Sequence, residues 1–165
     1  SAVYEQSWKQ GDVREIYLMR LRMEETAAKN NLKRGPGGVV DIEFIVQMFQ
    51  LLHGKKYKNL QTPNTLFALE VLADVGLMGD DTATSLRNAY GLLRKIEGRL
   101  RLLDVRLGHP FPEGYRERNQ LANLLNRQDG QALADEVLQT TRMVRRVFND
   151  IFSQAESQLA GDKTN

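Results

Sequence analysis

Hydrophobic residues recur along most of this chain at spacings of three and four positions, which is the period of an amphipathic α-helix. The clearest run consists of Leu86, Ala89, Tyr90, Leu93, Ile96, Leu100 and Leu103. No stretch alternates apolar and polar residues, as a half-buried strand would. The sequence therefore predicts an all-α fold, a helical bundle of about five to seven helices with no sheet.

Glycine, proline and capping residues divide this pattern into separate helices. The predicted helices cover residues 12–30, 40–52, 63–76, 82–103, 119–126 and 130–160. Asp80, Asp81 and Thr82 are each suitable caps for the fourth helix. A chain of 165 residues is long enough for one sizeable core. We therefore expect a single helical domain over residues 1–160 and a frayed tail over 161–165.

The composition excludes several functions. The net charge of +2 gives no reason to expect nucleic-acid or membrane binding, and no apolar run reaches the roughly 18 residues that span a bilayer. The absence of cysteine excludes disulfides and thiolate chemistry. His53 and His109 are far apart, so no metal site is expected. A polar start without a signal peptide favours a cytoplasmic location.

A glycine turn, with Gly35, Gly37 and Gly38, separates the first helix from the second and follows the basic pair Lys33 and Arg34. Glycine permits positive φ or a close approach of other groups, and a helix N-terminus offers unpaired N–H groups. The junction could therefore bind a phosphate or only turn the chain sharply. The Walker and Rossmann patterns do not fit, because no Lys-Ser/Thr follows the glycines and no strand precedes them.

The helix after the turn is apolar around more than half of its circumference when it is unrolled at about 100° per residue. Glu43, Gln47 and Gln50 share the narrow polar sector, whereas Asp41 projects into the apolar arc. A carboxylate aimed at a core is costly unless it is hydrogen-bonded or paired. Asp41 is therefore expected to cap the helix or to pair with an arginine of a neighbouring helix. The Glu43–Gln47 strip is either a solvated edge or one wall of a cleft.

Arginines form ridges on two of the predicted helices. Arg87, Arg94 and Arg101 recur every seven residues, and Glu97 is placed to pair with the last two. Such a ridge is either a solvated face or a docking surface for phosphates or an acidic partner. Few aromatic residues lie between the arginines, which argues against single-stranded nucleic acid. The last helix carries a similar group, Arg142, Arg145 and Arg146.

The run Lys-Arg-Gly-Pro-Gly-Gly-Val-Val-Asp-Ile-Glu-Phe-Ile-Val-Gln, residues 33–47, closely resembles the signature of bacterial glutamine synthetase adenylyltransferase, GlnE. Residues 20–23, 50–54, 63–65, 89–101 and 145–149 also resemble that family, so the likeness covers nearly the whole chain. It implies a helical domain that follows a nucleotidyltransferase domain. Enzymes of this family attach AMP to a tyrosine of glutamine synthetase or remove it by phosphorolysis.

The family's metal-binding Gly-Ser and Asp-x-Asp motif is missing here, so the chain should hold no catalytic residue and no metal, and should be inactive alone. The resemblance implies ATP and Mg²⁺ in the intact enzyme, with none bound tightly by this fragment. It also implies three partners, namely the enzyme's own nucleotidyltransferase domain, glutamine synthetase and the PII signal protein. Residues expected at the nucleotide cleft or the domain interface are Lys33, Arg34, Gly35, Gly37, Gly38, Asp41, Glu43 and Gln47.

Two alternatives remain open at this point. The chain could be a docking module that binds glutamine synthetase or PII without touching nucleotide, and the ridge of Arg87, Arg94 and Arg101 would then matter most. It could also be the equivalent helical domain of PII uridylyltransferase, although the Gly-Pro-Gly-Gly-Val-Val-Asp-Ile-Glu-Phe run agrees better with the adenylyltransferase.

Overall fold

A computed structural model describes residues 10–103 and 110–161 of the chain. In these residues it contains the α-helices α1 (Gln10–Glu25), α2 (Val39–His53), α3 (Thr65–Asp74), α4 (Asp80–Leu103), α5 (Tyr115–Leu124) and α6 (Gly130–Gly161), and the short 3₁₀-helix η2 (Lys58–Leu60). The predicted all-α class is thereby confirmed. His109 and residues 162–165 of the expected tail lie outside the described residues, and Gly161 ends α6.

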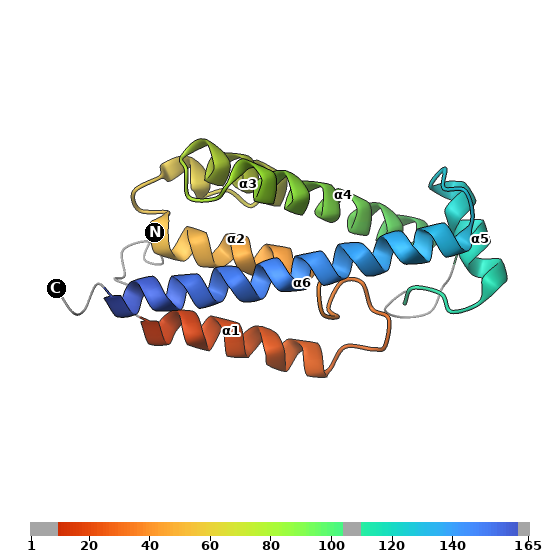
Figure 1. The fold of residues 1–165 in the computed structure, drawn as a ribbon, viewed down its shortest axis with the longest axis horizontal. Coiled ribbons are helices and arrows are strands. Elements are labelled where there is room, and N and C mark those ends of the chain that lie inside the picture. The colour runs from red at the N-terminus through yellow and green to blue at the C-terminus, as the bar shows by residue number, and fades with distance from the viewer. Residues whose placement is uncertain (1–9, 104–109, 162–165) are drawn as a thin grey trace.

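Two hydrophobic cores lie along the bundle. The first joins α1, α2, α3, the first half of α4 and the last half of α6, and Tyr17, Phe148 and Phe152 pack ring against ring in it. The second joins the end of α4 with α5 and the start of α6. Figure 1 shows α6 running along almost the whole bundle, with α1 on one side of it and α4 on the other. The helices α4 and α6 therefore hold the two cores together.

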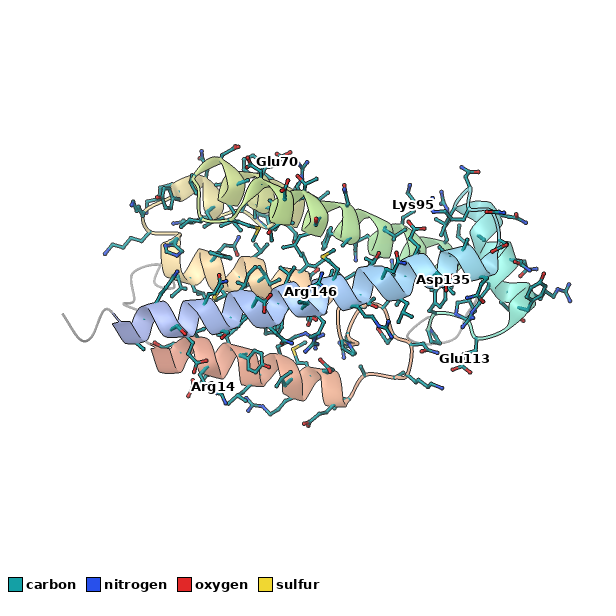
Figure 2. All side chains as sticks on the ribbon, in the orientation of Figure 1. Arg14, Glu70, Lys95, Glu113, Asp135 and Arg146 are labelled. Carbon is teal, nitrogen blue, oxygen red and sulfur yellow. The ribbon has the colours of Figure 1, made fainter. Side chains whose placement is uncertain are left out.

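Charged residues cover the outside of this bundle. Lys95 projects from the outer edge of the bundle (Figure 2), and Lys95, Asp135 and Arg146 are all exposed. Among the described helices, none has both the length and the apolar composition that crossing a bilayer requires.

The first helix ends five residues earlier than predicted, at Glu25 rather than residue 30. Asn30 takes a left-handed conformation, with φ of 60°, which an α-helix does not accommodate. The side-chain oxygen of Asn31 then accepts the N–H groups of Lys33 at 3.0 Å and Arg34 at 2.9 Å. Asparagine thus offers the backbone an alternative to helical hydrogen bonds, and the chain leaves the helix early.

Three smaller boundaries also differ from the prediction. Asp80 begins α4 itself, so the acidic residues occupy its first turn instead of capping it, where their charge still favours the helix dipole. The fifth helix starts at Tyr115, four residues before the predicted start. Pro63 precedes α3, and the next residue, Asn64, is the N-cap, with its side-chain oxygen accepting the Phe67 N–H at 3.0 Å.

Replacing Asn64 by alanine is expected to lower the free energy of unfolding by about 1 kcal/mol, because the Phe67 N–H loses its partner. Urea unfolding followed by circular dichroism would measure this change. Asn88→Ala is the matched control, since Asn88 is exposed within α4 and its replacement should shift stability by less than about 0.5 kcal/mol. Equal effects of the two substitutions would contradict the capping role.

Candidate functional site

The glycine turn packs too closely for side chains at its three glycines. Gly37 has a φ of +72°, and a Cβ on it would overlap the main-chain oxygen of Thr141 in α6. A Cβ on Gly35 would lie 2.5 Å from the carbonyl oxygen of Asn31, and one on Gly38 equally close to that of Leu32. The glycines are therefore required for the turn to fold onto itself and against α6.

The N–H groups of the turn are all used inside the protein. Those of Lys33 and Arg34 donate to the Asn31 side chain. The remaining bonds are Gly35 N–H to Asn31 O, Gly37 N–H to Asp41 Oδ2, Gly38 N–H to Gly35 O, Val39 N–H to Leu32 O, Val40 N–H to Lys33 O and Asp41 N–H to Gly38 O, at 2.7–3.1 Å. Because no N–H between residues 33 and 41 is left over, the main chain here is a sharp bend and not a phosphate cradle.

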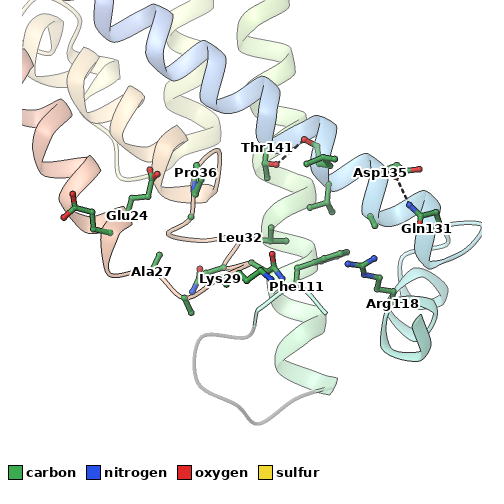
Figure 3. A pocket seen from close by; sticks show the side chains of 18 residues that line it. Glu24, Ala27, Lys29, Leu32, Pro36, Phe111, Arg118, Gln131, Asp135 and Thr141 are labelled. Atoms are coloured by element: carbon green, nitrogen blue, oxygen red, sulfur yellow. Dashed lines mark hydrogen bonds between the residues drawn. The ribbon is translucent and has the colours of Figure 1, made fainter. Parts of the chain in front are cut away.

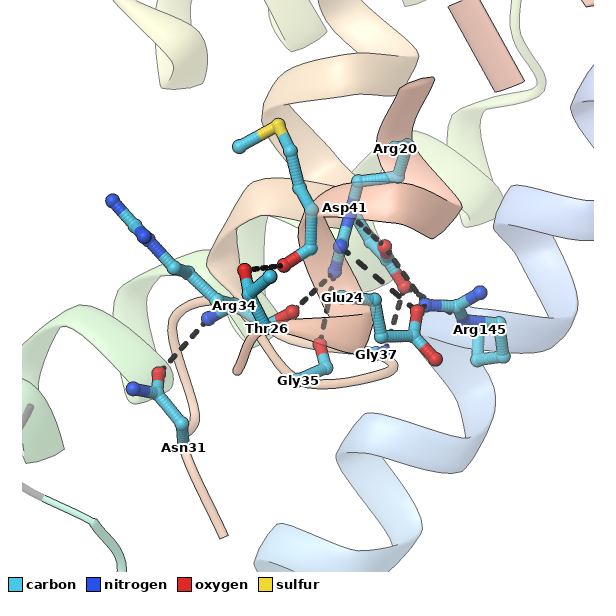
Figure 4. A network of polar contacts seen from close by, with 10 residues as sticks. Arg20, Glu24, Thr26, Asn31, Arg34, Gly35, Gly37, Asp41 and Arg145 are labelled. Carbon is cyan, nitrogen blue, oxygen red and sulfur yellow. Dashed lines mark hydrogen bonds and ion pairs between the residues drawn. The ribbon is translucent and has the colours of Figure 1, made fainter. Parts of the chain in front are cut away.

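Asp41 lies at the centre of a buried group of charges (Figure 4). Its Oδ1 is 2.7 Å from Nε of Arg20 in α1, its Oδ2 is 2.9 Å from Nε of Arg145 in α6, and Oδ2 also accepts the Gly37 N–H at 2.7 Å. Asp41 and Arg20 are fully buried. Burial is the largest influence and raises the pKa of the Asp41 carboxyl above its ordinary value, although the charges of Arg145 and Arg20 and the Gly37 hydrogen bond act to lower it. The predicted pairing with an arginine is therefore correct, and two arginines take part.

Asp41 is not the N-cap of α2, because that position belongs to Gly38, which provides no side-chain cap. Instead the Asp41 carboxylate reaches back to the N–H of Gly37, which immediately precedes the N-cap. The capping interpretation is therefore right only in a modified form. The carboxylate fixes the end of the glycine turn and at the same time ties α2 to its neighbours.

The two arginines extend this group to the turn and to a second carboxylate. Arg20 donates from Nη2 to the carbonyl oxygens of Arg34 at 2.9 Å and Gly35 at 3.0 Å. Arg145 pairs with Glu24, and its guanidinium lies 5.1 Å from the centre of the Phe148 ring. We call Arg20, Glu24, Asp41 and Arg145 the buried charge group. It joins α1, α2, α6 and the glycine turn into one unit.

The side chains of the basic pair point away from the buried charge group. Figure 4 shows Arg34 on the opposite side of the turn from Arg145. Lys33 and Arg34 are exposed, and Lys33 Nζ lies 4.0 Å from Glu97 Oε1 on α4. Glu97 also binds Arg101 at 2.9 Å and Arg94 at 3.1 Å. The structure thus brings the basic pair of the turn together with Arg94 and Arg101 of α4, two groups of cations that are far apart in the sequence.

A hollow of about 380 Å³ lies between the turn and α4. We call it the basic hollow. Its lining consists of Lys33, Arg34, Glu97 and Arg101 with Thr26, Ala27, Asn31, Leu32 and Leu100.

The polar strip of α2 is divided between packing and solvent. Glu43 is half-buried and accepts a long hydrogen bond, 3.4 Å, from the hydroxyl of Tyr90 in α4. Gln47 is exposed. Gln50, which shares the predicted sector, donates to the carbonyl oxygens of Leu60 at 2.9 Å and Thr62 at 2.7 Å. Gln47 therefore remains available to a partner, while Gln50 fastens the loop around η2.

The arginines of each predicted ridge have different partners in the structure. Arg87 pairs with Glu70 of α3 at 2.6 Å and takes no part in the basic hollow, in contrast to Arg101. On α6, Arg145 belongs to the buried charge group, whereas Arg142 and Arg146 are exposed and make no ion pair with any described residue. A sequence period of seven thus placed residues with different roles on the same predicted face.

A second pocket, of about 700 Å³, lies between the end of α1, the glycine turn and α6 (Figure 3). Leu32, Phe111 and Leu138 contribute to its apolar wall. At its rim, Arg118 donates to the Pro112 carbonyl oxygen at 2.6 Å and lies over the Phe111 ring. This pocket shares Ala27, Asn31 and Leu32 with the basic hollow, so the two adjoin beside the turn.

Sequence reasoning missed Arg20, Arg145 and Glu24 as members of the site. A usable signal existed for Arg20, which follows Val13, Ile16 and Tyr17 at helical spacing and so lies on the apolar face of its helix. A buried arginine requires a buried acceptor, and Asp41 was itself predicted to point inward. The same reasoning applies to Arg145, which lies among Thr141, Val144 and Phe148.

Comparison with known proteins shows the family to which the chain belongs. The chain belongs to the GlnD PII-uridylyltransferase family, whose model matches residues 14–152. It is similar to the bifunctional glutamine synthetase adenylyltransferase/adenylyl-removing enzymes of Xanthomonas campestris (34% identical over 136 residues, 82% of this chain), Streptomyces coelicolor (34% over 148, 85%) and Chromobacterium violaceum (35% over 123, 74%). These matches confirm the predicted resemblance to a GlnE-type helical domain. The chain spans only 14–15% of the length of these relatives.

Proposed function

We propose that this chain is the helical domain of a bifunctional glutamine synthetase adenylyltransferase, in which it supports transfer of AMP from ATP to glutamine synthetase and its removal by phosphorolysis. The observation that carries this proposal is that the structure holds the turn of the signature run, residues 33–47, in a fixed position. The buried charge group and the Asn31 side chain hold the turn from inside, while Lys33 and Arg34 remain exposed on its outer side.

The face around the turn suits a neighbouring domain of the same protein. It combines the cations of the basic hollow with the apolar wall of the adjoining pocket, and Gln47 adds an exposed amide on α2. A linked nucleotidyltransferase domain covering this face would bring the phosphates of ATP near Lys33 and Arg34. Asp41 would brace that surface from inside without touching nucleotide, because it is fully buried.

Mg²⁺ belongs to the linked domain in this proposal. Among the described residues, no three His, Asp or Glu side chains are grouped so that they could hold a metal ion. Within the whole protein Mg²⁺ would neutralise nucleotide phosphates, and this chain would contribute fixed positive charge. The proposed setting is the cytoplasm, with glutamine synthetase as substrate and PII as regulator.

The test is a Lys33→Ala, Arg34→Ala double variant of the intact enzyme, assayed for both adenylylation and removal of AMP. Loss of two charge-assisted contacts is expected to lower kcat/KM about a hundredfold or more, because each such contact is worth roughly 1.5 kcal/mol or above. Arg142→Ala with Arg146→Ala removes the same charge elsewhere and should leave both rates within about twofold. A normally folded Lys33, Arg34 variant with both rates unchanged would refute the proposed role.

A second candidate is the equivalent domain of PII uridylyltransferase, which the name of the matching family model favours. The relatives named above, which are adenylyltransferases, favour the first candidate. Incubating the intact protein with labelled ATP or labelled UTP, and with either glutamine synthetase or PII, separates the two. Label from ATP on glutamine synthetase supports the first candidate, and label from UTP on PII supports the second.

A further inference from the structure

The basic hollow carries an unbalanced charge. Lys33, Arg94 and Arg101 all approach one carboxylate, Glu97, and Arg34 lines the same hollow without an ion pair to any described residue. Arg94 does not line the hollow, so three cations, Lys33, Arg34 and Arg101, against one carboxylate leave it a surplus of two positive charges. The Glu97 side chain is only 13% exposed, whereas the side chains of Lys33 and Arg101 are 47% and 56% exposed. The carboxylate therefore lies beneath cations that still face solvent.

Several of these cations come from fixed parts of the structure. The backbone of Lys33 and Arg34 is held by the Asn31 side chain, and the Arg34 carbonyl oxygen by Arg20. Arg101 lies on helix α4, and its Nη2 is held 2.9 Å from Oε1 of Glu97. Cations oriented in advance lose less entropy when they bind an anion. A guanidinium group can also donate two parallel hydrogen bonds to two oxygens of one phosphate.

We propose that the basic hollow binds a phosphate group, which either a nucleotide or free orthophosphate would supply. A volume of about 380 Å³ lies in the range of small-ligand pockets, and a doubly charged phosphate would balance the surplus of two charges. This inference deepens the proposed function and rests on it for its biological meaning. The binding itself is a property of this chain and can be measured without the enzyme's activity.

The experiment titrates the 165-residue chain with orthophosphate, and separately with ATP, at low ionic strength, and follows amide chemical shifts by NMR. Both hydrophobic cores lie within the described part of this chain, so the fragment contains its own folding unit. Saturable shifts are expected at residues 31–35 and 97–101. They should weaken with added salt, because exposed charges are screened.

Paired variants distinguish binding at the basic hollow from general attraction of phosphate to positive charge. Arg34→Gln with Arg101→Gln should weaken phosphate binding at least about tenfold. Arg142→Gln with Arg146→Gln removes the same two charges from α6 and should change it less than about twofold. In the opposite direction, Glu97→Gln should strengthen binding severalfold, because the competing carboxylate loses its charge. Glu113→Gln, which removes the exposed partner of Lys29, should leave it unchanged.

The titrations and variants together decide whether the basic hollow binds phosphate. Binding of orthophosphate, ATP or both at the basic hollow supports the inference and identifies the source of the phosphate. Two results would overturn it: no saturable binding of either probe, or equal weakening of binding by the two arginine pairs. If phosphate binds but the intact Lys33, Arg34 variant keeps both activities, the proposed function fails alone. If the intact variant loses activity while the chain binds no phosphate, this inference fails alone.

Discussion

Gly37→Ala is expected to lower the free energy of unfolding by roughly 4 kcal/mol or more, and to prevent folding if the domain is only marginally stable. The added methyl group would overlap the main-chain oxygen of Thr141, and neither the turn nor α6 can move without disturbing the buried charge group. The positive φ of +72° adds a conformational cost of roughly 1–2 kcal/mol for any L-residue. Chemical unfolding of the purified chain would measure the sum.

Gly76→Ala is a closely matched control for this prediction. Gly76 has nearly the same φ, +75°, but a Cβ there meets no atom within 4 Å. Its substitution should therefore cost only the conformational part, about 1–2 kcal/mol. The difference between the two variants isolates the close approach of the turn to α6. Equal losses at Gly37 and Gly76 would show that this approach contributes nothing to stability.

Asp41→Asn is expected to destabilise the domain by about 3–5 kcal/mol, because it leaves the fully buried Arg20 with only the more distant Glu24, at 3.9 Å, as a charged partner and deprives Arg145 of one of its two. Asparagine has nearly the same shape and can still accept the Gly37 N–H, so the loss reports mainly on charge. Urea unfolding of the variant and the parent chain provides the measurement.

Glu70→Gln is the control for the charge effect, because it breaks the partly exposed pair with Arg87 at 2.6 Å. Surface pairs of this kind contribute about 0–1 kcal/mol, so the control should differ clearly from Asp41→Asn. An Asp41→Asn loss no greater than that of Glu70→Gln would mean that the buried arginines find other partners or water.

The helices were predictable wherever the hydrophobic spacing agrees with the residues, such as glycine, that end a helix. The limits of α2 lie within one residue of the predicted 40–52, because glycines precede it and Gly54 follows it. The end of α1 was not predictable from periodicity, since an asparagine side chain competes there with the helical hydrogen bonds. Helical registry could therefore be read from the sequence, but local side-chain competition could not.

The candidate site was predictable only one residue at a time. The position of Asp41 around its helix predicted that its side chain points inward and needs a partner. It could not identify which arginines are the partners, since these lie on other helices, α1 and α6. The meeting of Lys33 with Glu97 likewise depends on how the turn packs against α4. Such contacts between distant segments are set by packing, which a single sequence without relatives does not specify.

The pairing of α1 with α6 has a consequence for how the chain folds as it is made. Glu24 and Arg145, which bind each other in the buried charge group, are 121 positions apart in the sequence. Nearly all of the chain must therefore leave the ribosome before the first core can close, and the parts of α1 and α2 that pack against α6 stay uncovered until then. The second core, built from the neighbouring α4, α5 and α6, has no comparable delay between its parts. Synthesis thus leaves the surfaces of α1 and α2 that await α6 exposed while the rest of the chain is made, and during this time the nascent chain is open to aggregation and to chaperones.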